Sequence, residues 1–154
     1  MVEGKLLTKE TRTAMVNREL PPVQFEVEKS HIARFAASIG DHNPLWADSK
    51  EAHEGPNGGI VAPPTFLRAV PMGIPDPPEL AHLNKILDAA SDWEYFEQVR
   101  PGDSITAQIR ITGVTERTLS LGPAVFLILE TTYSNQNGSP VAKQKSTFIR
   151  YGAD

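Results

Sequence analysis

The feature that most constrains the fold is an alternation of apolar and polar residues in the second half of the chain. Four apolar residues alternate with four polar ones, namely Ile105, Ala107, Ile109 and Ile111 with Thr106, Gln108, Arg110 and Thr112. A period of two residues indicates a strand with one face in the core and one in water. The uninterrupted apolar run 124–129 predicts a central strand buried on both faces, and Asn137-Gly138 predicts a turn into a last strand over 141–151.

The first half of the chain has the pattern of short helices. Ile32, Phe35, Ala36 and Ile39 recur at helical spacing, with Ser30 as the expected N-cap and Gly40 as the stop. Asp48 or Ser49 is expected to cap a second helix through His53, before the glycine-rich loop 55–59. Helices followed by strands predict the α+β class.

Prolines punctuate the segment between the two halves. Pro63 and Pro64 are expected to begin a buried helix, because proline is tolerated in the first turn. The prolines at 71, 75, 77 and 78 exclude regular structure and predict a loop or lid.

Composition and charge exclude several classes of partner and cofactor. The 154 residues fit a single domain. The formal charge of −4, from 15 basic and 19 acidic residues, argues against a nucleic-acid partner. The chain has no Cys and no metal-ligand spacing, so no metal or cofactor is expected. The lack of a long apolar segment and of a secretory signal predicts a cytoplasmic protein with no membrane partner.

One polar stretch could carry chemistry. Asp41 follows the helix-ending Gly40, and Asn43-Pro44 form a turn immediately after it. Turn hydrogen bonds would hold this carboxylate in place. It is a candidate general base, and the alternative is an Asx-turn residue that only shapes the loop.

Three blocks of residues resemble the MaoC-like hydratase and dehydratase family, in particular its N-terminal, FAS1-like dehydratase branch. They are Phe35-Ala36-x-x-x-Gly40-Asp41-x-Asn43-Pro44-Leu45, Gly59-Ile60-Val61-Ala62-Pro63-Pro64-Thr65-Phe66, and Trp93-Glu94-Tyr95-Phe96 with Val99-Arg100-Pro101-Gly102-Asp103. The resemblance implies a single hot-dog domain over 1–154, with a long central helix wrapped by an antiparallel β-sheet. It runs from about Val23 to Tyr151, so residues 1–22 are expected to form an N-terminal extension.

The resemblance also implies an acyl-thioester site. Catalytic members pair an Asp with a His five residues later; here the Asp position is Asp41 and the His position is Trp46. An indole N–H cannot exchange protons near neutral pH. Trp46 is therefore either core packing or a wall of the acyl pocket. The expected substrate-binding residues are Asn43, Trp46, Gly59, Val61, Ala62, Pro63, Thr65 and Phe66.

A second departure concerns the start of the central helix. In the hydratases that this chain resembles, a His-Gly dipeptide at the start of the central helix offers backbone N–H groups to the thioester carbonyl. Pro63 and Pro64 have no N–H, which leaves those of Thr65 and Phe66.

These observations support two hypotheses. The first is the His-lacking, substrate-shaping subunit of a heteromeric (3R)-hydroxyacyl-thioester dehydratase or enoyl-coenzyme A hydratase, a lyase of fatty acid metabolism. The second is a stand-alone homodimeric hydratase or acyl-coenzyme A thioesterase that uses Asp41. Both predict an acyl-coenzyme A or acyl carrier protein thioester as the ligand, and a second hot-dog unit as the partner.

Overall fold

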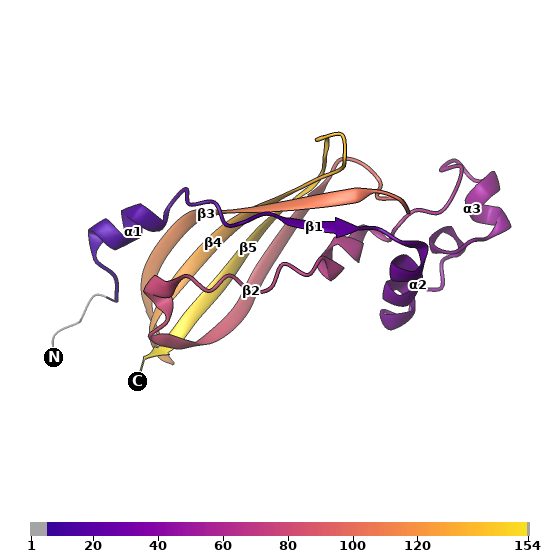
Figure 1. The fold of residues 1–154 in the computed structure, drawn as a ribbon. Coiled ribbons are helices and arrows are strands. Elements are labelled where there is room, and N and C mark those ends of the chain that lie inside the picture. Colours follow the sequence, from indigo (N-terminus) through magenta and orange to yellow (C-terminus); the bar gives the residue numbers. More distant parts are fainter. Residues whose placement is uncertain (1–5, 154) are drawn as a thin grey trace.

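The protein is built on one curled antiparallel sheet, seen in a computed structural model that describes residues 6–153 (Figure 1). The strands are β1 (Val23–Glu26), β2 (Leu83–Tyr95), β3 (Ser104–Leu119), β4 (Gly122–Ser134) and β5 (Pro140–Ala153). They lie in the order β1-β3-β4-β5-β2. The helices are α1 (Lys9–Met15), α2 (Lys29–Ser38) and α3 (Lys50–Glu54), with 3-10 helices η1 (Pro44–Trp46), η2 (Pro64–Ala69) and η3 (Pro78–Leu80).

The predicted strands are confirmed. The apolar residues of the alternating stretch are buried in β3, where Ile105 and Ile111 have no exposed surface. β4 occupies the predicted central position, and Gly138, with a φ of 77°, forms the turn into β5. Burial of β4 on both faces is only partly correct: Phe126 and Ile128 stay partly exposed, because no helical layer covers that face of the sheet.

The two early helices are also present. α2 ends as predicted before Gly40, whose φ of 68° suits glycine. Its N-cap is Glu28, so the expected cap at Ser30 is wrong: the helix begins earlier, at Lys29. α3 is capped as predicted by Ser49, whose side chain accepts a hydrogen bond from the Ala52 N–H at 3.0 Å.

The α+β class and the hot-dog fold are confirmed, but the long central helix is wrong. The helix at the predicted place is η2, which has six residues in 3-10 geometry. It cannot extend further, because Val70 precedes Pro71: a residue before proline avoids the helical conformation, and proline itself donates no N–H to a helix. The expected loop follows, with no regular structure from residue 71 to residue 77. The exclusion of regular structure at Pro78 is wrong, because Pro78 begins η3, where proline is tolerated in the first turn.

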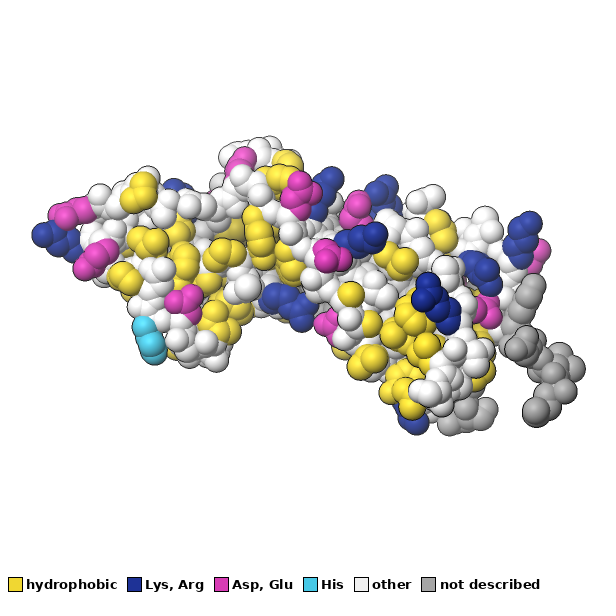
Figure 2. All heavy atoms as spheres, turned by 180° about the vertical axis from the view of Figure 1, so that it is seen from behind, with side chains coloured by type: hydrophobic (Ala, Val, Ile, Leu, Met, Phe, Trp, Pro, Cys, Tyr) yellow, Lys and Arg dark blue, Asp and Glu magenta, His cyan; other side chains and the backbone are white. Residues whose placement is uncertain are grey.

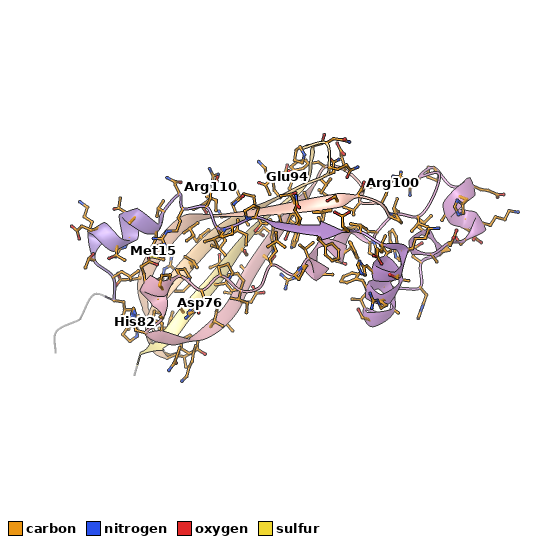
Figure 3. All side chains as sticks on the ribbon, in the orientation of Figure 1. Met15, Asp76, His82, Glu94, Arg100 and Arg110 are labelled. Carbon is orange, nitrogen blue, oxygen red and sulfur yellow. The ribbon has the colours of Figure 1, made fainter. Side chains whose placement is uncertain are left out.

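Two apolar clusters fill the concave side of the sheet. The first lies where α2 and η2 meet the sheet and includes Phe66 and Tyr133. The second lies toward α1 and includes Leu80 and Met15, and Figure 3 shows Met15 between α1 and the sheet. Residues 6–15 are thus packed on the sheet.

The proline segment is tied down by the buried guanidinium of Arg150. Its Nε donates to the Leu83 carbonyl at 3.0 Å and its Nη2 to the Leu80 carbonyl at 3.3 Å. Its Nη1 lies 2.8 Å from an Asp76 carboxylate oxygen. This buried cation, 7% exposed, needs such partners to offset its lost hydration.

Candidate functional site

Asp41 is held in a rigid turn at the end of α2. Its N–H donates to the Ala36 carbonyl at 2.9 Å, and its Oδ1 accepts a hydrogen bond from the Asn43 N–H at 3.1 Å. Asn43 continues the turn, because its own Oδ1 accepts from the Leu45 N–H at 3.0 Å and caps η1. The Asx-turn interpretation of Asp41 is therefore confirmed, and Asn43 acts here as a cap.

Trp46, which the resemblance aligns with a histidine, contacts the carboxylate of Asp41 directly. Its indole Nε1–H donates to Asp41 Oδ2 at 2.8 Å. The ring is partly buried and packs against the first apolar cluster, as the core-packing interpretation of Trp46 predicts; its role as a wall of an acyl pocket stays a prediction. Both oxygens of Asp41 thus accept hydrogen bonds, and one donor is a group that cannot serve as an acid near neutral pH.

The neighbouring histidines do not replace the missing one. His42 is exposed and makes no hydrogen bond with any residue in the range 6–153. His53 contacts Asp48, with Nε2 and Oδ1 2.6 Å apart. Hydrogen bonds from His53 and Lys29 lower the pKa of Asp48, so this pair is a separate surface cluster.

The start of η2 offers a single unused amide. The Phe66 N–H donates to the Pro63 carbonyl at 2.9 Å, and Pro63 and Pro64 have no N–H. Of residues 63–66, only Thr65 therefore keeps an amide that no described residue accepts. The expectation that Phe66 could also donate to a thioester carbonyl is wrong, because its N–H closes the first turn.

The expected substrate-binding residues do not line one cavity. Ala62 and Pro63 line a groove of about 250 Å³ with Tyr95 and Phe96. Thr65 lines a second groove, of about 420 Å³, with Trp93 and Tyr95. The other expected residues line neither groove. Phe66 lies in the first apolar cluster, Val61 is buried with its N–H donating to the Leu45 carbonyl at 3.3 Å, Gly59 lies in the loop before it, and Asn43 and Trp46 lie in the turn.

A further cavity, of about 350 Å³, was not foreseen from the sequence. Its roof is the segment 68–75, and its floor is the concave face of the sheet. The floor includes four buried polar residues: Thr131, Tyr133, Gln144 and Ser146. The sequence does contain a signal for these residues. Each lies an even number of positions from buried apolar residues of the same strand, so the alternation of side chains along a strand places it on the core face.

Two tyrosines border these hollows and stay protonated. Burial raises the pKa of Tyr133, whose hydroxyl donates to Gln144 Oε1 at 2.9 Å. Burial also raises the pKa of Tyr95, whose ring stacks on Trp93 at 5.7 Å between centroids. Trp93 and Tyr95 therefore share one face of β2.

Two structural absences bear on the class of site. Among residues 6–153, no three His, Asp or Glu side chains gather in a way that could hold a metal ion. In the same range, no helix is both long and apolar enough to cross a bilayer.

A curled antiparallel sheet with few helices defines a hot-dog fold. Solved structures show the same fold. The ChsH1-ChsH2 complex from Mycobacterium tuberculosis matches with a TM-score of 0.74 and 18% identity, over 88% of this chain and 89% of that one. The MaoC-like dehydratase from Rhodospirillum rubrum matches with a TM-score of 0.72 and 20% identity, over 88% and 92%.

The sequence comparisons assign the family. The family described as FAS1-like, dehydratase domain region matches residues 14–144, and the chain belongs to it. A UPF0336 protein of Parafrankia sp. is 28% identical over 84% of this chain and 87% of its own length. A probable enoyl-CoA hydratase alpha subunit of Thermomonospora curvata is 26% identical over 78% of this chain and 43% of its own length.

Proposed function

We propose that this chain is the His-lacking, substrate-shaping subunit of a heteromeric acyl-thioester hydratase or dehydratase. The observation that carries the proposal is the hydrogen bond from Trp46 Nε1 to Asp41 Oδ2 at 2.8 Å. Reversible hydration of an enoyl thioester needs one group to take a proton from water and another to deliver a proton to the α-carbon. Trp46 donates to the carboxylate of Asp41 from the position at which the reaction would need an imidazole that can exchange a proton. A partner must then supply the missing acid.

The free edge of the sheet supports a second hot-dog subunit as that partner. β2 has 13 residues and pairs only with β5 within the described sheet. Leu87, Tyr95 and Phe96 on or next to it are between 43% and 49% exposed, and Figure 2 shows hydrophobic side chains open to solvent among charged ones. A long edge strand with exposed apolar side chains favours pairing with another chain.

The grooves support an acyl thioester as the ligand. They run from Pro63, at the start of η2, past Tyr95 to Arg68 and Asp88. Aromatic and aliphatic walls suit an acyl chain, and the Thr65 amide is the one donor at the helix start for the thioester carbonyl.

The test is hydration of crotonyl-coenzyme A by the purified chain, with and without a hot-dog subunit that carries an intact Asp-x₄-His motif. We expect negligible turnover from the chain alone, and turnover in the mixture that exceeds that of the partner alone. Robust hydration by the isolated chain, abolished by Asp41→Ala, would contradict the proposal.

The alternative is a stand-alone homodimer in which Asp41 activates water for thioester hydrolysis or hydration. Its support is the fixed position of Asp41, a partly exposed carboxylate held by two donors. A thiol reagent would then detect release of coenzyme A from acyl-coenzyme A, and Asp41→Asn would abolish it. Release that persists in Asp41→Asn would exclude this alternative.

A further inference from the structure

The cavity between the segment 68–75 and the sheet exists because the central helix is short. Where a longer helix would fill the concave face, η2 ends at Ala69 and irregular backbone continues above the sheet. The segment is anchored beyond the cavity by the ion pair of Arg150 with Asp76 at 2.8 Å. The cavity is therefore bounded by structure that is held in place.

Its floor has a polar patch in the middle of an apolar surface. Thr131 lies opposite Gln144 in the pairing of β4 with β5, and Ser146 lies two residues further along the same face. Their exposed fractions are 2%, 6% and 4%. Apolar residues of the cavity surround them: Ile86, Ile109, Leu129 and Phe148. Burying polar groups costs free energy unless they find partners.

Part of the patch is already ordered. Tyr133 donates to Gln144 Oε1 at 2.9 Å, and Gln144 Nε2 donates to Ser91 Oγ at 2.8 Å. An amide nitrogen has two N–H groups, so the second one of Gln144 remains available. The hydroxyls of Thr131 and Ser146 make no hydrogen bond to any described residue. Neither hydroxyl oxygen is fully buried, because the one fully buried side-chain N or O atom without a partner among the described residues is Arg12 Nε. Both hydroxyls therefore reach the free space of the cavity, where a ligand atom could pair with them.

The cavity adjoins the grooves that start at Pro63. It shares Arg68 and Asp88 with the groove lined by Thr65, and that groove shares Tyr95 with the one lined by Pro63. Arg68 and Asp88 form an exposed ion pair at 3.4 Å, from η2 to β2. An acyl chain that enters at the start of η2 would therefore pass this pair before reaching the polar patch.

We propose that the cavity takes the distal part of the acyl group and recognises a hydroxyl or carbonyl oxygen on it, through Thr131, Ser146 and the free N–H of Gln144. This inference rests on the proposed function and adds its substrate class: a thioester whose acyl group carries an oxygen substituent remote from the thioester. The apolar residues contact the methylene groups, and the patch pairs with the oxygen. An unsubstituted chain leaves the hydroxyls unpaired, so the site discriminates against it.

The experiment is isothermal titration calorimetry of the full chain with dodecanoyl-coenzyme A and with its mono-hydroxylated derivatives, the hydroxyl placed at each mid-chain carbon in turn. We expect one derivative to bind about tenfold more tightly than the parent, as one or two buried hydrogen bonds would produce.

Matched variants locate the effect. Thr131→Val with Ser146→Ala removes both hydroxyls at nearly constant volume, and we expect it to abolish the preference while leaving binding of the unsubstituted chain the same or tighter. The control is Thr132→Val with Thr147→Val, which removes two hydroxyls from the opposite face of the same strands and should keep the preference.

The outcomes separate the two proposals. Equal binding of all the thioesters by the wild-type chain, or a preference that survives in Thr131→Val with Ser146→Ala, overturns the oxygen recognition but leaves acyl binding intact. Absence of binding by any of the thioesters overturns both proposals.

Discussion

At the scale of single residues, Trp46 joins the packing of the core to the turn that holds Asp41. Its ring packs on the first apolar cluster, and its N–H meets Asp41. Substitution of Trp46 therefore changes both the packing and the chemistry of the turn.

We predict that Trp46→His gives the isolated chain a low but measurable hydration of crotonyl-coenzyme A. The imidazole would place an exchangeable proton beside Asp41, whereas Pro63 and Pro64 would still offer no N–H to the carbonyl, which keeps the rate low. The measurement is the loss of enoyl absorbance over a range of pH, and it should show dependence on a group titrating near neutrality. Trp46→Phe, which removes the donor and adds no acid, is the control. If the two variants are equally inactive, the cause of inactivity lies at the start of η2.

At the scale of elements, α1 is docked by one carboxylate of β3. Glu116 accepts from the Leu6 and Leu7 N–H groups at 2.9 and 3.2 Å, and from Arg12 Nη2 at 2.7 Å. Burial alone would raise the pKa of Glu116, but these hydrogen bonds outweigh it and lower the pKa. The ionised form is thus favoured in the folded state.

This lowered pKa predicts a dependence of stability on pH. The contribution of Glu116 is fully present above its unfolded-state pKa and is lost as pH falls through the lower folded-state pKa. Glu116→Gln should cost about 1–2 kcal/mol at neutral pH and flatten the acid limb, as measured by urea unfolding at several pH values. Glu94→Gln, on an exposed position of β2, is the control. An equally steep acid limb in Glu116→Gln would contradict the assignment.

The individual strands and helices differ in how well the local sequence predicts them. β3 and β5 were predictable because alternation is a local pattern that the sheet preserves, and α3 because Ser49 is a good cap. The length of the central helix came from the resemblance and was wrong, although Pro71 limits η2 by a local rule. The polar patch was missed because, although alternation within each strand places Thr131 and Gln144 on the core face, only the pairing of β4 with β5 brings the two side chains together.

At the scale of the whole molecule, one sheet carries an incomplete site and an unpaired edge. Under the proposed function, a second hot-dog subunit would both supply an acid to Asp41 and cover the open β2 edge. That subunit would cover the apolar side chains of β2 and bring its own His toward the grooves. Assembly and activity should therefore fail together when the edge is altered.

We predict that Leu87→Lys weakens association with a second hot-dog subunit, whether a copy of this chain or a different one. Leu87 lies on β2 and is 49% exposed. Loss of the burial of one leucine, about 1–2 kcal/mol, corresponds to roughly a tenfold change in dissociation constant. The matched control is Leu121→Lys at the turn between β3 and β4, where the side chain is 63% exposed. Analytical ultracentrifugation would measure both. Equal weakening by the two variants would point to general charge repulsion, and no weakening by Leu87→Lys would place the interface elsewhere than this part of β2.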